Sequence, residues 1–514
     1  MRGTPDRSVV SSVQAPIPGN TRKAIDMAGN SAATSALPKL PAVRGAARLP
    51  AKTGHPSFSV LIGDAKLVST VDRYAAGKAL RGKVPRDRHG AWKRRETRTD
   101  PIRILRAEDA ARLPNLVPIR YGRMLASPFT FYRGAAAVMA ADLARIPVSG
   151  IKVQACGDCH LLNFGGFATP ERNILFDIND FDETLPAPWE WDVNRLVASF
   201  ALAARAIGLK DSSGRDIAAA CARSYRKVLR EFSEMHPLQV WYARVTADNL
   251  IETLPASRRA AMRRQMEKAV SRTGSELDFP KLTEMSGGHI GIRDAPPLIY
   301  HPETPHTSGF VKALGHAYAK YRDTLEDDRR VLLDQYRVVD AAIKVVGVGS
   351  VGLRCWIALL MSASNDPLFL QFKEAIQSAL EPYSGRSAYS HHGQRVVMGQ
   401  RLMQPASDMF LGWVTLPGGK HYYVRQLRDA KIKPMIETFD SDDLCDYAKT
   451  CGRVLARAHA KGGDACLISG YLGTSPRFDE AMGKFAVAYA DQAERDHAEL
   501  KAAVRNGKIE AYRE

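Results

Sequence analysis

The segment 157–165, with the sequence GDCHLLNFG, places three side chains of catalytic type on one short stretch of chain. An aspartate such as Asp158 can accept the proton of a hydroxyl group, His160 is a second candidate catalytic residue, and Asn163 offers a neutral oxygen ligand. The acidic segment 177–183, DINDFDE, follows shortly afterwards. Its carboxylates repel one another unless a metal ion, an arginine or a helix N-terminus compensates them.

The order of these groups is typical of phosphoryl transfer to a hydroxyl group. In that chemistry Asp158 accepts the proton, while Asn163 and Asp180 hold the Mg²⁺ that bridges the phosphates. The pattern D-x-x-x-x-N is common by chance, but G-D-x-H-x-x-N-F followed by D-F-D is far more specific. The structural alternative is that Asp158 and Asn163 cap turns and that Asp180 caps a helix.

A glycine-rich segment far downstream, GVGSVG at 347–352, is a candidate phosphate-binding loop. A Rossmann dinucleotide site would need an acidic residue about 20 positions further on, but Lys373 stands there instead. A glycine-rich hairpin followed by a strand-borne lysine is the protein-kinase arrangement. The sequence therefore predicts that Gly347, Gly349, Gly352 and Lys373 bind a nucleotide.

The predicted nucleotide-binding lysine lies in the segment LQFKEA, followed by Glu374 and, further on, by Glu381. We expect Lys373 to pair with the α and β phosphates of ATP, and Glu374 or Glu381 to pair with Lys373. The alternative is a surface lysine beside a glycine-rich hairpin, since glycines also mark bulges and turns.

The seven cysteines are odd in number and scattered, which predicts reduced thiols in a cytoplasmic protein. Cys156 and Cys159 form C-G-D-C, a spacing that also occurs in zinc and redox sites. A structural zinc site needs four ligands, and the sequence holds no second C-x-x-C pair. A serine hydrolase is disfavoured as well, because G-x-S-x-G is absent and Ser350 is out of register for it.

The composition is that of an ordinary globular chain. Of 514 residues, 45% are hydrophobic and 25% are charged, which excludes a wholly disordered, collagen-like or coiled-coil protein. No apolar run is long enough to predict a membrane span. The formal net charge is +18, of which +12 falls within the first 100 residues. A basic excess favours anionic partners, but here it belongs mainly to the N-terminal part.

The N-terminal 107 residues are predicted to precede the main fold, whose order is expected to begin near residue 108. Residues 1–50 are rich in Ser, Ala, Pro and Gly, and are predicted to form a disordered tail. Residues 51–107 form a basic arm with its densest charge at 78–98. This stretch is expected to be solvated. The functional alternative is that this stretch makes weak, non-specific contact with nucleic acid.

The rest of the chain predicts an α+β fold of two lobes. Residues 108–338 are predicted to form a mostly helical lobe with the catalytic loop and an insertion near 275–310. Residues 339–440 form a glycine-rich β lobe, and residues 441–514 form C-terminal helices. The hydrophobic pattern predicts helices at 134–146, 188–270, 312–334, 441–461 and 477–503, strands at 151–156, 173–178, 340–373, 395–404 and 420–427, and a long loop at 286–308.

Several segments closely resemble the bacterial family DUF2252, a domain of unknown function, and the resemblance extends from about residue 70 to 505. The segments are 120–136, 156–200, 347–355, 370–375 and 455–464. The central motif is also similar to the catalytic loop H-G-D-x-H-x-x-N of aminoglycoside and choline phosphotransferases. That loop matches Gly157, Asp158, His160 and Asn163, whereas Cys156 replaces the usual first histidine.

The resemblance to these kinase-like enzymes implies further roles. Asp180 and Phe181 match their metal-binding D-F, and Asp192 matches the helix-borne aspartate that supports the catalytic loop. In kinases the glycine-rich loop and the lysine precede the catalytic loop, whereas here they follow it. The resemblance therefore implies a protein-kinase-like fold that is circularly permuted.

Together these features predict an ATP- and Mg²⁺-dependent phosphotransferase acting on a hydroxylated acceptor, with transfer of AMP as the alternative chemistry. Arg133, just upstream of the catalytic loop, is expected either to touch an anionic substrate or to form a buried ion pair. Two other function classes stay open. One is a non-catalytic nucleotide-binding regulatory module of the same fold, and the other is a nucleic-acid-associated protein acting through its basic arm.

Overall fold

The computed structural model describes residues 68–253, 279–301, 308–427 and 432–512, and isolated residues between 259 and 267. The chain is α+β, as the sequence predicts. The predicted tail at 1–50 lies outside the described residues, as does the first part of the basic arm. Within the described part, no helix combines the length and the apolar character that a bilayer span requires.

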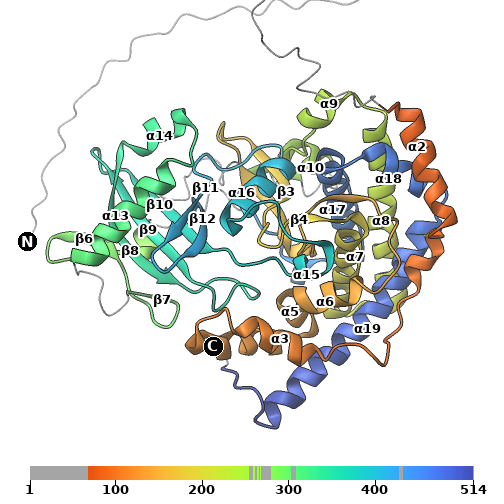
Figure 1. Ribbon diagram of the computed structural model, residues 1–514, viewed down its shortest axis with the longest axis horizontal. Helices are drawn as coiled ribbons and strands as arrows, with labels where there is room; N and C mark the ends of the chain where they lie inside the picture. The colour runs from red at the N-terminus through yellow and green to blue at the C-terminus, as the bar shows by residue number, and fades with distance from the viewer. Residues whose placement is uncertain are drawn as a thin grey trace, which may run out of the picture. The chain divides into compact units, whose positions relative to one another are not determined.

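A body of helices is centred on α7 (Trp189–Ala206), which is buried on every side from Trp189 to Ala204 (Figure 1). A helix enclosed in this way is normally apolar, yet α7 buries Asp192 and Arg195. Buried polar side chains need partners, and the candidate site supplies them. Helices α8 (Asp211–Ser233), α17 (Ser441–Gly462) and α19 (Arg477–Arg505) pack against α7. Helix α18 (Ala465–Leu472) packs against α8, and α2 (Thr70–Ala79) packs against α18.

The described residues form further helices, of which α13 (Ser308–Arg322) and α16 (His392–Met403) pack against the large sheet. The others are α3 (Pro101–Asp109), α4 (Val117–Leu125), α5 (Pro128–Gly134), α6 (Ala136–Leu143), α9 (Pro237–Tyr242), α10 (Ala247–Thr253), α14 (Asp327–Leu333) and α15 (Glu381–Ser384).

The largest sheet has six antiparallel strands, and its strand β10 carries Lys373. Side chains along β10 alternate between two apolar faces. Leu370 and Phe372 pack on the side of α13, whereas Phe369 packs on the opposite side. The same alternation places Lys373 on the face of Phe369 and Glu374 on the other. The strand order is β11 (Gly412–Leu416), β12 (Lys420–Gln426), β10 (Pro367–Glu374), β9 (Cys355–Ser362), β8 (Tyr336–Lys344) and β7 (Ile299–Tyr300).

Short strand pairs position the two segments of catalytic type. β1 (Lys152–Ala155) pairs with β4 (Leu185–Pro188), and β2 (Phe164–Ala168) pairs with β3 (Ile174–Ile178). The residues flanking the β2–β3 hairpin meet at one end, where the Asn179 N–H donates to the Asn163 carbonyl at 2.9 Å. The catalytic-type loop and the acidic segment therefore emerge side by side.

Two predicted elements differ from the structure. Residues 395–404 were expected as a strand but belong to helix α16, which His391 caps by accepting a hydrogen bond from the Gln394 N–H at 3.1 Å. Val396 and Val397 are β-branched residues, which locally favour a strand. In the structure both are buried on one face of the helix. The segment 286–308 was expected as a loop, yet it contains β6 (His289–Ile292), which pairs with β5 (Thr283–Ser286), and β7.

The basic stretch 78–98 is part of the fold rather than a solvated arm. Arg81 and Arg86 donate to backbone carbonyls at the C-terminal end of α18, and Arg98 forms ion pairs with Asp142 and Asp496. These arginines satisfy acceptors on other elements, a role that the charge pattern alone does not reveal. The described helices accordingly begin with α2 and not near residue 108.

Candidate functional site

The loop 156–160 carries Asp158 directly after β1. Gly157 has φ +83°, and a side chain there would lie 2.5 Å from a backbone oxygen of the acidic segment. Asp192 of α7 accepts hydrogen bonds from the backbone N–H groups of Cys156 at 2.8 Å and Gly157 at 3.0 Å. The carboxylate of Asp192 therefore holds the loop from the helix, which is the position that the resemblance implies for it.

Helix α17 secures Asp192 from the other side. His459 Nε2 lies 3.1 Å from Asp192 Oδ2, and the Tyr225 hydroxyl oxygen lies 2.8 Å from His459 Nδ1. All three side chains are buried. No sequence pattern assigned a role to His459, since only the fold brings α17 against the loop.

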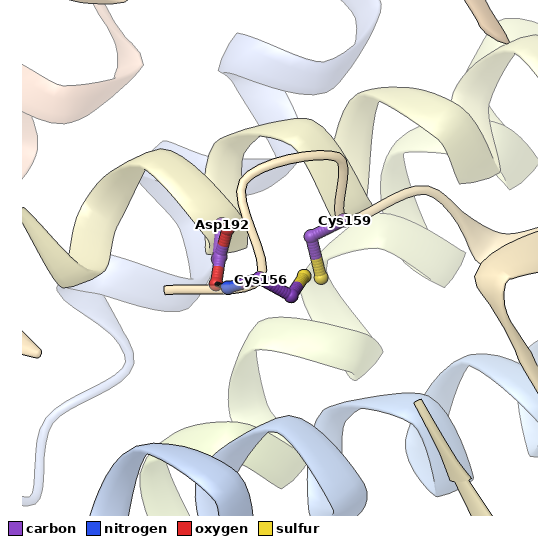
Figure 2. Close-up of side chains that lie close together, drawn as sticks. All are labelled: Cys156, Cys159 and Asp192. Carbon is purple, nitrogen blue, oxygen red and sulfur yellow. Dashed lines mark hydrogen bonds between the residues drawn. The ribbon is translucent and has the colours of Figure 1, made fainter. Parts of the chain in front are cut away.

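The thiols of Cys156 and Cys159 point toward each other, while the Asp192 carboxylate faces the backbone of Cys156 (Figure 2). One ligand atom from each of the three residues lies within 4.8 Å of the others. Burial raises the pKa of both thiols, that of Cys159 to about 12, and Asp192 already holds the loop. A zinc site needs thiolates, so the arrangement fits two protonated thiols packed beneath the loop.

Arg195, one helical turn after Asp192 on α7, holds the Asp158 carboxylate. Its guanidinium donates to Asp158 Oδ1 at 2.5 Å and to the Tyr132 carbonyl at 3.0 Å. Burial alone would lower the pKa of Arg195, but the negative charge of Asp158 raises it. Sequence reasoning missed Arg195, although its spacing of three residues from Asp192 places both side chains on one face of the helix.

The second candidate catalytic residue, His160, is buried beside Asp158. Its Nε2 lies 3.9 Å from Asp158 Oδ2. Burial lowers the pKa of His160 well below its usual value, so the ring is neutral near pH 7. Its Nδ1 is buried without a hydrogen-bond partner among the described residues. His160 can therefore shape the site, but it does not supply a positive charge there.

Asn163 and Asp180 lie at the same end of the β2–β3 hairpin and line one cavity. The Asn163 amide nitrogen donates to the Asp158 carbonyl at 2.7 Å, which leaves the amide oxygen as the atom able to ligate a cation. The Asp180 side chain is 33% exposed, and burial raises its pKa. An amide oxygen and a carboxylate at a cavity fit Mg²⁺, which keeps several water or phosphate ligands.

The sheet brings Lys373 into this cluster. Its Nζ lies 4.0 Å from Asp180 Oδ2 and forms a closer ion pair with Asp182, 191 residues away in the chain. Asp182 also accepts hydrogen bonds from the hydroxyl groups of Tyr423 at 2.8 Å and Ser350 at 3.2 Å. Burial would lower the pKa of Lys373, but the two carboxylates raise it well above its usual value. The lysine therefore carries its full charge.

The predicted pairing of Lys373 with Glu374 or Glu381 is wrong. Glu374 pairs instead with Arg354 at 3.3 Å and with Lys420 at 3.7 Å, because adjacent residues of a strand point to opposite faces. Glu381 accepts a hydrogen bond within its own turn. The acidic partner of Lys373 comes from the segment that follows β3.

The glycine-rich loop 347–352 joins β8 to β9, and its first residues line the same cavity. Gly347 has φ +74°, a left-handed conformation that favours glycine. Arg112 donates to the Gly349 carbonyl at 2.8 Å, while Gly352 packs against the Arg112 side chain. Arg112, which also lines the cavity, thus holds the loop, with Gly347 and Gly349 at the cavity and Gly352 away from it.

The cavity itself has a volume of about 470 Å³, within the usual range for small-molecule sites. Lys373 is 4% exposed and lies behind the two aspartates that it pairs with. Burial raises the pKa of Glu183, at the cavity wall, to about 7. The sequence-predicted residues that line the cavity are Arg133, Asp158, His160, Asn163, Asp180, Gly347, Gly349 and Glu374.

Residues 112–503 match the protein family described as an uncharacterized protein conserved in bacteria (DUF2252), and the chain belongs to this family. The matched range contains the loop with Asp158, the acidic segment and the strand with Lys373. No curated protein matches the chain, and no solved structure matches it.

Proposed function

We propose that this chain is an ATP- and Mg²⁺-dependent phosphotransferase that acts on a hydroxylated acceptor. The observation that carries the proposal is that Asp158 and Asp180 line one cavity and that Lys373 lies 4.0 Å from Asp180, behind the cavity wall, although the three come from distant segments. A proton acceptor, a metal ligand and a phosphate-binding lysine are the groups that kinase-type transfer needs. Burying charges costs desolvation energy, so stability alone is a weak reason for this convergence.

We further propose that the fold is kinase-like and circularly permuted. In support, the glycine-rich loop joins β8 to β9, and Lys373 lies on the next antiparallel strand, β10. This is the order of a kinase nucleotide-binding lobe, but it follows the loop of Asp158 in the chain. Catalysis depends on positions in space, and permutation preserves them.

In the proposed reaction, Asp158 accepts the proton of the acceptor hydroxyl group, and Arg195 keeps its carboxylate in place. The hydroxyl oxygen forms a bond to the γ-phosphorus of ATP. The bond from that phosphorus to the bridging oxygen of ADP breaks, and ADP leaves with the electron pair. Asn163 and Asp180 would hold Mg²⁺, which neutralises charge on the phosphates. Lys373 contributes a fixed positive charge behind Asp180.

A non-catalytic nucleotide-binding module of the same fold is the second candidate. The observation that favours it is that both key charges already have partners, since Arg195 holds Asp158 and Asp182 holds Lys373. A regulatory module would bind Mg²⁺–ATP without turning it over.

The experiment compares Asp158→Asn and Asp180→Asn in ATP binding, ATP hydrolysis and phosphate transfer to a panel of hydroxylated acceptors. A proton acceptor acts mainly in the transition state. We therefore expect Asp158→Asn to lower turnover by about 10²–10⁴-fold with ATP affinity nearly unchanged. Asp180→Asn should weaken Mg²⁺-dependent ATP binding as well, because its charge would face the metal before the reaction.

The matched control is Asp446→Asn, an exposed aspartate on α17 whose side chain is 55% exposed. It should behave as the wild type in all three assays. Binding of Mg²⁺–ATP without hydrolysis or transfer would decide for the regulatory module. Absence of Mg²⁺–ATP binding would reject both candidates.

A further inference from the structure

Arg133 lies at the C-terminal end of helix α5, in the wall of the cavity. The helix is well anchored, because Ser127 and Thr130 form a capping box at its start. At its other end, the Arg133 carbonyl packs 3.3 Å from the position of a Cβ on Gly349. The backbone of Arg133 is therefore held between the helix cap and the glycine-rich loop.

The guanidinium of Arg133 has no hydrogen-bond or ion-pair partner among the residues that the structure describes. Its Nε–H group is buried and donates to no acceptor among the described residues, and burial lowers the pKa of Arg133. The carboxylates that act most strongly on it are Asp158 and Asp180. Asp158 is already paired with Arg195, and Lys373 lies 4.0 Å from Asp180. The guanidinium of Arg133 therefore lies at the cavity without a carboxylate bonded to it.

Two other arginines with inaccessible side chains, Arg120 and Arg98, pair directly with carboxylates. Arg120 pairs with Glu108 at 2.7 Å and with Asp109 at 2.9 Å. Arg98 likewise lies between two carboxylates. Arg133 is only half-buried, but withdrawing its guanidinium from water without a carboxylate partner still costs desolvation energy. A purely structural role for Arg133 does not repay that cost, whereas an anionic ligand in the cavity does.

We infer that Arg133 binds the transferring phosphoryl group of the nucleotide, an inference that rests on the proposed function. In that reaction the phosphoryl group passes between the proton acceptor and the metal ligand. Asp158 and Asp180 are those two residues, and both act on Arg133. A planar guanidinium offers paired donors to phosphate oxygens. Arg133 would neutralise charge on the oxygens of the transferring group, as an arginine supplied in cis does in some nucleotide hydrolases.

The test measures the affinity of the full chain for Mg²⁺–ADP with and without aluminium fluoride, a mimic of the transferring phosphoryl group. We expect aluminium fluoride to tighten ADP binding by the wild type. In Arg133→Gln this gain should fall by about tenfold or more, since removing such an arginine costs about 10³–10⁵ in turnover. Binding of Mg²⁺–ADP alone should not change. Arg133→Lys should recover only part of the increase in affinity, because a lysine ammonium cannot donate the two parallel hydrogen bonds that a guanidinium offers to a phosphate.

Two controls separate this role from a structural one. Arg103→Gln removes an exposed arginine from α3 and should keep the full aluminium fluoride gain. The melting temperature of unliganded Arg133→Gln should not fall, because the variant loses a half-buried charge that has no carboxylate partner. A clear fall in melting temperature would identify a structural ion pair and overturn the inference.

The outcomes distinguish this inference from the proposed function. If Arg133→Gln keeps the full gain, Arg133 does not touch the phosphoryl group and contacts the acceptor or nothing. If the wild type binds Mg²⁺–ADP with an affinity that aluminium fluoride does not increase, the inference on phosphoryl transfer is wrong. The result would then favour the non-catalytic nucleotide-binding module. If the wild type binds no Mg²⁺–ADP, the inference and the proposed function both fail.

Discussion

Buried carboxylates in this protein differ in what neutralises them. Asp479 is compensated by Arg226 at 2.7 Å. Glu190, at the start of α7, is fully buried and accepts a hydrogen bond from the Ser149 N–H at 2.6 Å. Its second carboxyl oxygen has no hydrogen-bond partner among the described residues. Burial therefore raises the pKa of Glu190 to about 7.

The raised pKa of Glu190 predicts that stability falls as the pH rises. The folded protein holds the proton more tightly than the unfolded chain, whose glutamate has its ordinary pKa of 4.5. The stabilisation is complete below about pH 4.5 and is lost as the pH rises through about 7. Glu190→Gln keeps the Ser149 hydrogen bond and cannot ionise. Relative to the wild type, the variant should gain about 2–3 kcal/mol between pH 5 and pH 8 in urea unfolding.

The control for this prediction is Glu231→Gln, an exposed glutamate on α8. Its free energy of unfolding should follow the wild-type pH profile. A Glu190→Gln profile that stays parallel to the wild type would mean that Glu190 is ionised throughout this range.

At the scale of elements, helix α2 lies against α18 through a pair of glycines. A Cβ on Gly77 of α2 would lie 2.0 Å from the Leu467 carbonyl oxygen, and a Cβ on Gly470 of α18 would lie 2.1 Å from the Tyr74 carbonyl oxygen. Each glycine thus allows the backbone of one helix to approach the other. Because backbone atoms cannot rotate away as a side chain can, neither contact tolerates a methyl group.

We therefore predict that Gly470→Ala forces α2 away from α18. Overpacking typically costs about 1–3 kcal/mol, and a clash with backbone places this variant at the upper end, measured by urea unfolding. Gly82→Ala is the matched control, since a Cβ there meets nothing within 4 Å. It should change the free energy of unfolding by less than about 1 kcal/mol. Equal effects of the two substitutions would contradict this close helix contact.

At the scale of the whole molecule, the segment before α3 joins parts of the chain that are far apart in sequence. Arg98 donates to Asp142 of α6 at 2.8 Å and pairs with Asp496 of α19 at 2.6 Å. All three side chains are nearly inaccessible, with 4% or less exposed. The basic segment therefore acts as a buried connection between the middle and the end of the chain.

Arg98→Met should destabilise the protein by about 3–5 kcal/mol, because it leaves two buried carboxylates without their cation. The loss should depend little on salt, since the pair is shielded from solvent. Arg94→Met, which removes an exposed pair with Glu499, should cost less than about 1 kcal/mol. Urea unfolding at low and high salt measures both. A small, salt-dependent effect at Arg98 would indicate a solvated arm after all.

Local sequence patterns were sufficient to predict many helices and strands, and to predict which chemical groups a single segment carries. The apolar repeat at 441–461 and 477–503 predicted helices, and α17 and α19 confirm them. The strands with Lys373 and with 420–427 were also predicted. The residues Asp158 and Asn163 are close in sequence, so their common loop needed no tertiary information. Such features depend on neighbours within a few positions, which the sequence lists directly.

Only the tertiary structure decided how these segments meet. The sequence suggested Glu374 or Glu381 as the partner of Lys373, but strand geometry turns the adjacent Glu374 to the opposite face, and Glu381 bonds within its own turn. The fold instead brings Asp182 to the lysine and Arg195 to Asp158. Long-range contacts of this kind depend on how whole elements pack, and no local spacing encodes them. The sequence by itself thus determined which chemical groups are available, and packing determined which charges compensate one another.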